Sequence, residues 1–293
     1  MGKIIIRVPA TSANFGPGYG SIGLALHLYL TVIIEEVTET WHVNHALGDG
    51  IPTDEHNLIV QTALRINQNL VPHQLTIMSD IPIYRGLGSS MSAIIAGIKV
   101  ANALTEHDYT LQEQMDLAAK LEGHADNAGA ALLGSAVVSD FDGTDAHAVK
   151  LPFPDEIQAL AFIRAQGVDQ KAKDEATPKT LPFEEAVETS GAANMLVAAL
   201  ETGQWAIASR MIERDNFHEK ALADLVPELD MIREKAHELN IYGTYLSGNG
   251  PTVITLGTEP QLTQLRQKIN MLDLPGSIRR LTIDRDGATT INE

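Results

Sequence analysis

The stretch IPIYRGLGSSMSAIIAGIKVAN, residues 81–102, places an arginine, two glycines and two serines directly ahead of an apolar, helix-like run. Gly86 and Gly88 give the backbone access to turn conformations that are closed to other residues. Ser89 or Ser90 stands where the N-cap of a helix is wanted. The stretch therefore predicts a tight turn followed by a helix that ends near Leu104.

The start of this helix is a candidate phosphate site. The first N–H groups of a helix have no partner within the helix, and the helix dipole adds partial positive charge there. A di- or triphosphate fits such an opening, Arg85 would add charge, and a serine hydroxyl would ligate Mg²⁺. A capped helix after a tight turn explains the same residues equally well. The loop is not a Walker A motif, because no Gly-Lys-Ser/Thr follows at the required spacing.

Composition narrows the class of protein. The 293 residues include 44% hydrophobic and 20% charged residues, a globular balance rather than a disordered one. The net charge of −17 and the lack of a Lys/Arg cluster argue against a nucleic-acid surface. There is no cysteine, and no apolar run reaches the ~20 residues that cross a bilayer. The short apolar triplet near the N-terminus leads us to expect no signal peptide. We expect a cytoplasmic protein that binds neither nucleic acid nor membranes.

Strand-like and helix-like segments alternate without a strict βαβ rhythm, which favours an α+β fold. The Pro-rich passage LPFPDEI is the candidate domain boundary and divides the chain into residues 1–152 and 153–293. Strands are expected at 3–8, 24–37, about 74–83, within 131–141 and 158–165, and on both sides of the turn at 247–252; helices are expected at about 57–70, 111–121 and 183–203 and across 203–240. A further helix and a closing strand at 277–284 complete the pattern.

A second glycine-rich segment, residues 18–23, satisfies the dinucleotide pattern G-x-G-x-x-G. That pattern needs a helix directly afterwards to receive the pyrophosphate. The segment that follows, LALHLYLTVII, is strand-like, so the sequence argues against a Rossmann domain.

Two polar segments are ambiguous when each is taken alone. EGHADN, residues 122–127, offers Glu122, His124, Asp126 and Asn127 for a metal or a proton, or is a polar helix end that leads to the next strand. It lacks the second ligand pair of a zinc site. SGNGPT, residues 247–252, is most simply a hairpin turn, in which Gly248 and Gly250 also allow a ligand close to the backbone.

Together and in this order, PATSANFGPGY, IPIYRGLGSS, EGHADN and YLSGNGPTVITL resemble the GHMP small-molecule kinases, and within that superfamily the homoserine kinase family. The resemblance runs from Ile4 to Leu256. It implies a two-domain α+β fold, with a phosphate-loop domain at the N-terminus and an α/β sandwich domain at the C-terminus. It also implies ATP as phosphoryl donor, Mg²⁺ as metal, a small alcohol as acceptor and a homodimer.

The resemblance assigns roles to particular residues. Arg85-Gly86-Leu87-Gly88-Ser89-Ser90 would be the phosphate loop, with Pro82 ahead of it, and Ser90 and Glu122 would ligate Mg²⁺. Asn14 and Asn127 would lie at the acceptor, and with Arg85 they are the candidate catalytic residues. Gly248 and its turn would close the site. An amide at position 127 cannot accept a proton, so the implied mechanism is transition-state stabilisation without a strong protein base.

The expected acceptor site departs from the family pattern. Gly20 stands where the family has an aspartate that faces the amino group of homoserine. Asp174 and Leu222 stand where it has arginines for the carboxylate, and Gln170 stands where Thr or Ser is common. Tyr84 replaces a usual alanine.

Three hypotheses follow from this mixture of kept and altered residues. The first is an ATP-dependent kinase of homoserine. The second is the same chemistry on another small primary alcohol, because losing a buried ionic contact costs about 2–5 kcal/mol. The third is a nucleotide-binding protein without catalysis, against which the retained Ser90 and Glu122 speak.

Overall fold

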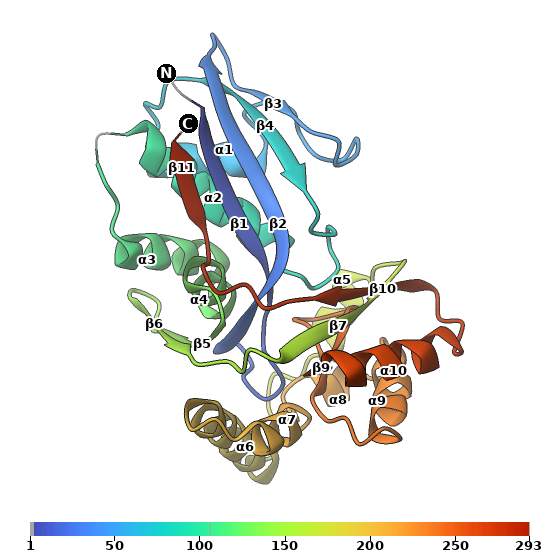
Figure 1. The fold of residues 1–293 in the computed structure, drawn as a ribbon. Coiled ribbons are helices and arrows are strands. Elements are labelled where there is room, and N and C mark those ends of the chain that lie inside the picture. Colours follow the sequence, from blue (N-terminus) through green and yellow to red (C-terminus); the bar gives the residue numbers. More distant parts are fainter. Residues whose placement is uncertain (1–2, 106, 293) are drawn as a thin grey trace.

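The computed structural model describes residues 3–105 and 107–292 and forms two β-sheets with helices packed on them (Figure 1). The strands are β1 Ile4–Ser12, β2 Ile22–Val37, β3 His42–Asn44, β4 His73–Ser79, β5 Ala136–Phe141, β6 Ala146–Leu151, β7 Ile157–Arg164, β8 Thr244–Leu246, β9 Val253–Thr258, β10 Gly276–Leu281 and β11 Thr289–Asn292. The helices are α1 Leu58–Ile66, α2 Ser89–Leu104, α3 Leu111–Glu122, α4 Asp126–Leu133, α5 Gln170–Ala176, α6 Phe183–Glu201, α7 Trp205–Ile212, α8 Glu219–Leu222, α9 Glu228–His237 and α10 Glu259–Asn270. The predicted α+β class is confirmed.

The first sheet is organised by the long strand β2. Its first residues pair with β5 and its second half pairs with β4, while β1 runs antiparallel along most of its length. Side chains in the second half alternate between buried and partly buried, as expected for a strand with one face on a core. Helices α2 and α4 pack on this sheet and carry the two motifs expected at the site.

The second sheet has the strand order β10-β7-β9-β8 and is entirely antiparallel. Helices α9 and α10 pack on it and bury an apolar cluster that includes Leu222, Leu229 and Leu262. Strands β8 and β9 flank the SGNGPT segment, so the expected hairpin is confirmed. The boundary between residues 152 and 153 stays a prediction; the sheets change between β6 and β7, but β11 returns to pair with β1 (Figure 1).

Two local expectations were wrong. The N-cap of α2 is Gly88 rather than a serine; its φ of 69° is left-handed, and Ser89 is the first helical residue. EGHADN does not lead directly to a strand, because α4 begins at Asp126 and precedes β5. The segment after residues 18–23 is a strand, as expected, so the G-x-G-x-x-G match opens no helix.

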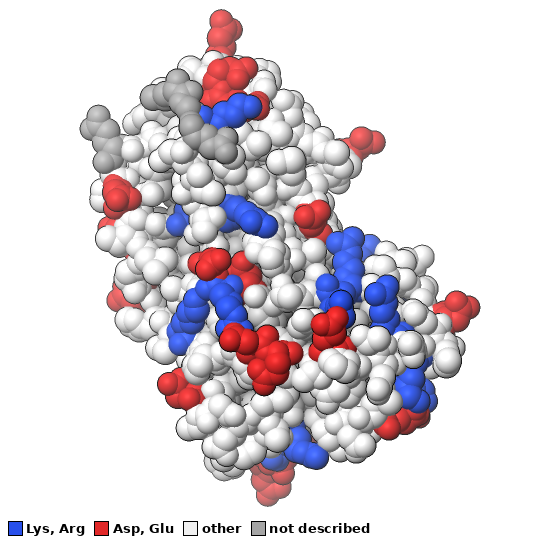
Figure 2. Space-filling view, in the orientation of Figure 1, with Lys and Arg blue, Asp and Glu red and all other residues white. Residues whose placement is uncertain are grey.

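Charged groups of both signs are interspersed on the face shown in Figure 2, without a continuous basic surface. In the part of the chain that the structure describes, no helix has the length and apolar character needed to span a bilayer.

Candidate active site

The loop Arg85–Ser90 is held from behind by the turn at residues 247–252. The hydroxyls of Ser247 and Thr252 donate to the carbonyl oxygens of Gly86 and Arg85, each at 2.5 Å. A Cβ on Gly86 would lie 2.4 Å from the Ser247 carbonyl oxygen, and one on Gly88 would lie 2.0 Å from Thr11 Oγ1. Only glycine allows this approach. The loop carbonyls are therefore engaged by protein, and the opening of α2 borders a cavity.

That cavity, of about 450 Å³, is bordered by the loop, by the start of α2, by the end of α3 and by α5. It is lined by Gly86, Gly88, Ser89, Ser90 and Glu122, together with Gln170 and Lys173. A helix N-terminus with unused N–H groups is a natural anion site. This geometry suits the phosphate chain of a nucleotide.

Glu122 and Ser90 border the same cavity from different helices. Glu122 ends α3, and its Oε2 is buried without a hydrogen-bond partner among the described residues. Burial raises the pKa of this carboxyl; Asp126 raises it further, while His124 opposes the shift. An orphaned carboxylate oxygen opposite a serine hydroxyl is a donor set that Mg²⁺ accepts. The residues present therefore fit the metal that the resemblance implies.

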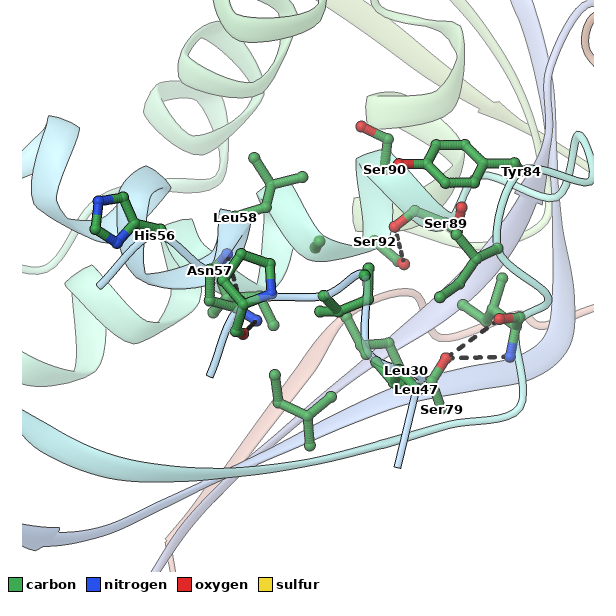
Figure 3. Close-up of a pocket in the computed structure, with 18 residues that line it drawn as sticks. Leu30, Leu47, His56, Asn57, Leu58, Ser79, Tyr84, Ser89, Ser90 and Ser92 are labelled. Atoms are coloured by element: carbon green, nitrogen blue, oxygen red, sulfur yellow. Dashed lines mark hydrogen bonds between the residues drawn. The ribbon is translucent and has the colours of Figure 1, made fainter. Parts of the chain in front are cut away.

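A second cavity, of about 250 Å³, shares Tyr84, Ser89 and Ser90 with the phosphate cavity (Figure 3). Leu30, Leu47 and Ile59 supply apolar walls, and Tyr84 lies close to Ser89 and Ser90. Its apolar lining beside a phosphate site suits a nucleobase. The sequence gives no sign of this cavity, because its residues are scattered from Leu30 to Ala93 and form no motif.

A third cavity, of about 310 Å³, shares Gly86, Gly88, Glu122 and Asn249 with the phosphate cavity. It brings together Asn14, Gly20, Asn127 and Gly248, which are four of the residues expected at the acceptor. Gln170 lines the phosphate cavity instead. Asp174 lines neither of these cavities and accepts a hydrogen bond from Gln170 at 2.8 Å.

Asn127 is fixed by a hydrogen bond from β1. The buried hydroxyl of Thr11 donates to Asn127 Oδ1 at 2.6 Å, so the amide nitrogen is left as a donor at the cavity. Both carboxylate oxygens of the neighbouring Asp126 have hydrogen-bond partners. Its Oδ1 is 2.6 Å from His124 Nδ1, and its Oδ2 accepts from the Asn14 backbone N–H. The Thr11–Asn127 pair could not be found from the sequence, because 116 residues separate the partners.

Asn14 joins the two halves of the molecule at this cavity. Its Oδ1 accepts from the Gly20 N–H at 3.1 Å, and its Nδ2 lies 3.2 Å from Nε2 of the buried His218. His218 forms an ion pair with Asp215, and its Nε2 lies 2.9 Å from the Gly248 carbonyl oxygen. Burial lowers the pKa of His218, but Asp215, Glu219 and the Gly248 carbonyl outweigh it, and the net shift is upward.

Arg85 does not point at any of these cavities. Its guanidinium donates to the carbonyl oxygens of Arg164 and Ala165 and to those of Ile83 and Tyr84. The expectation that Arg85 adds charge to the phosphates, or acts in catalysis, is therefore at odds with its position. Its role is to join the loop to the end of β7. Pro82 lies ahead of the loop and lines none of the cavities described above.

Comparison with known proteins identifies the family of this chain. The models of the GHMP kinase N-terminal domain and the GHMP kinase C-terminal domain match residues 57–135 and 196–271. The chain therefore belongs to the GHMP kinase family, whose members are ATP-dependent phosphotransferases.

Individual relatives narrow this class to the homoserine kinases. The chain is 44% identical over 284 residues to homoserine kinase of Leuconostoc mesenteroides and 46% identical over 284 residues to that of Limosilactobacillus fermentum, with 97% of this chain covered in both and 97% and 99% of the relatives. A solved Listeria monocytogenes structure assigned to the homoserine kinases matches with TM-score 0.89 and 39% identity and covers 99% of each chain. The predicted two-domain GHMP kinase fold is confirmed.

Proposed function

We propose that this protein transfers the γ-phosphoryl group of ATP to the side-chain hydroxyl of homoserine and so forms O-phosphohomoserine and ADP. The observation that carries the proposal is the junction of two cavities, one at the helix N-terminus and one at Asn14 and Asn127, which share Gly86, Gly88 and Glu122. The junction sets a phosphate chain beside an acceptor pocket. The homoserine kinase relatives support the choice of substrate.

The α2 N-terminus binds the phosphates through backbone N–H groups and the helix dipole. Ser90 and Glu122 would hold Mg²⁺, which when bound neutralises charge on the phosphate oxygens. The cavity beside Tyr84 would take the base of the nucleotide. Positioning and charge neutralisation are most of what phosphoryl transfer asks of a protein.

In the reaction, the acceptor oxygen bonds to the γ-phosphorus as the bond from that phosphorus to the β–γ bridging oxygen breaks. ADP keeps the electron pair of the broken bond, and the acceptor's hydroxyl proton passes to solvent. The Asn127 amide N–H, held by Thr11, donates to the reacting oxygens and stabilises charge that develops there. Asn127 cannot take the proton, and the Asp126 carboxylate is already hydrogen-bonded.

A second candidate acceptor is a small primary alcohol without a carboxylate. Among the described residues that line the acceptor cavity there is no Lys or Arg, whereas Glu122 and Asp126 line it. Burial raises the pKa of Tyr19 in that cavity, and the nearby carboxylates of Asp215, Asp126 and Asp174 raise it further. Leu222 is 1% exposed, within the core of the second sheet. This acidic surrounding disfavours a carboxylate.

A coupled ADP-release assay with Mg-ATP, homoserine and a panel of short alcohols tests both candidates. We expect turnover with homoserine at a KM of about 1 μM to 1 mM. Turnover on carboxylate-free alcohols alone would replace homoserine by the second candidate. No turnover on any alcohol, with ATP still bound, would indicate a nucleotide-binding protein instead.

Glu122→Ala separates catalysis from folding in the same assay. Activity should fall at least about 100-fold, the effect of losing one transition-state contact, while thermal stability is kept because an unpaired buried carboxylate stabilises nothing. Glu113→Ala on the same helix is the matched control. It removes the carboxylate of an exposed capping box, so the start of α3 is slightly weakened and activity remains. Retained activity in Glu122→Ala would remove Glu122 from the site.

The family resemblance implies a homodimer, and the sequence predicts a cytoplasmic location. Both remain predictions. Sedimentation of the purified protein and fractionation of producing cells test them.

A further inference from the structure

Lys173 is a buried cation without a carboxylate partner in the described part of the chain. It lies on α5, its exposed fraction is 6%, and its ammonium donates to the Gly250 carbonyl at 3.2 Å. Lys171 on the same helix differs, because it is exposed and lies 3.7 Å from Glu175. An ammonium has three donors, so two remain for a ligand at Lys173.

The surroundings of this ammonium belong to the phosphate cavity. Lys173 lines it together with Gly88, Ser89, Ser90 and Glu122. It does not line the acceptor cavity, where Asn14 and Asn127 lie. The anion nearest to Lys173 in a loaded site would therefore be the phosphate chain rather than the acceptor.

The energetics also call for an anion. Burial lowers the pKa of Lys173; the Asp174 carboxylate, which forms no ion pair with it, opposes this shift, and Arg85 adds a smaller lowering. A buried cation costs free energy unless it is paired, and one carbonyl oxygen is a weak partner. A structural role, in which Lys173 holds the 247–252 turn through Gly250, explains this hydrogen bond. It does not explain why a charged side chain is buried there.

We propose that the Lys173 ammonium binds an oxygen of the phosphoryl group in transfer and is a catalytic residue of this enzyme. The inference rests on the proposed function, since it assumes a nucleoside triphosphate at the α2 N-terminus. Lys173 takes the place that the sequence analysis gave to Arg85, whose guanidinium is used by carbonyl oxygens. A fixed cation at the transferred group stabilises charge that spreads over its oxygens in the transition state.

The test compares Lys173→Gln, Lys173→Arg and the control Lys171→Gln. Each protein is titrated calorimetrically with Mg-ADP and with the Mg complex of β,γ-imido-ATP. The difference between the two affinities reports on the γ-phosphate alone. For Lys173→Gln we expect affinity for the triphosphate to fall at least about 30-fold, the loss typical of a buried charged contact, with ADP affinity changed less than about threefold. Lys173→Arg should restore part of the loss, and Lys171→Gln should match the wild type.

Two outcomes would overturn the proposal. Equal losses of ADP and triphosphate affinity, with a lower melting temperature, would mean that Lys173 only supports the Gly250 turn. A rise in the KM for homoserine with triphosphate binding unchanged would assign the cation to the acceptor's carboxylate. Failure of the proposed function is distinguishable, because a wild type without alcohol turnover still gives the difference between ADP and triphosphate binding.

Discussion

The phosphate side and the acceptor side of the site are built from different materials. The phosphate side is backbone: Gly86 and Gly88 allow the loop to pack against β1 and the 247–252 turn, which leaves helix N–H groups for the ligand. The acceptor side is side chains: Thr11 orients Asn127, and His218 lies against Asn14. A backbone site binds any phosphate chain, whereas a side-chain site can change its substrate by substitution. The contrast gives a physical reason for the prediction from the sequence that the phosphate side keeps the family pattern while the acceptor side departs from it.

The largest effect is expected on the backbone side. In Gly88→Ala the new Cβ would lie 2.0 Å from Thr11 Oγ1, at a φ of 69°. We expect the free energy of unfolding to fall by about 2–5 kcal/mol, from left-handed strain and overpacking, and affinity for β,γ-imido-ATP to fall by more than about 100-fold. Urea unfolding and calorimetric titration measure the two.

Gly143→Ala is the control for this substitution. Its φ of 96° is also left-handed, but nothing lies within 4 Å of the added Cβ. Strain alone should cost about 1–2 kcal/mol and leave nucleotide binding unchanged. Normal nucleotide affinity in a folded Gly88→Ala protein would contradict the claim that the phosphate side depends on a glycine backbone, since the loop would then tolerate a side chain.

A smaller effect, confined to catalysis, is expected on the acceptor side. Asn127→Ala should lower kcat by about 100-fold, the usual cost of one transition-state donor, with the Kd for ATP unchanged. Thr11→Val, which removes only the positioning hydrogen bond, should lower kcat by up to about tenfold. Steady-state kinetics and titration separate the two constants, with the exposed Asn194→Ala as control. Weakened ATP binding at constant kcat would mean that Asn127 contacts the phosphates rather than the acceptor.

The smallest effect concerns the contact of the two halves at His218 and should depend on pH. The pKa of His218 is raised in the folded protein, against its burial, by Asp215, Glu219 and the Gly248 carbonyl. The stabilisation is therefore complete below the ordinary histidine pKa of about 6.5 and is lost as pH rises through the folded-state pKa. We expect the free energy of unfolding of the wild type to exceed that of His218→Gln by on the order of 1.5 kcal/mol at pH 6. The difference should be smaller at pH 9.

Urea unfolding at the two pH values measures this difference. His237→Gln, which alters a half-exposed histidine beside Glu213, is the control and should show a smaller change. A stability difference that grows with pH would mean that His218 is buried in its neutral form.

The sequence predicted local features well and distant ones poorly. The alternation in β2 and the apolar run of α2 are local signals, and both elements lie where they were expected. The cap of α2 was wrong because the left-handed conformation of Gly88 displaces the serines by one position. Helix α4 was missed because eight residues rich in alanine and glycine carry little periodicity.

At the proposed site, the motifs pointed to the glycine loop, Glu122 and Asn127, which line the cavities, but not to the residues that hold or complete them. Thr11 and the base cavity depend on contacts between distant segments. Lys173 is one of two lysines on a seven-residue helix, and only its burial beside the loop distinguishes it from Lys171. The direction in which Arg85 points was equally beyond the sequence.

Strand β11 lies beside β1, with Ile4 opposite Asn292, so both ends of the chain share one sheet. The polypeptide thus passes between the sheets twice, once after β6 and once after β10. Any movement of one sheet relative to the other must therefore bend both connections together. A short linker from end to end would yield a circular permutant with its catalytic groups undisturbed.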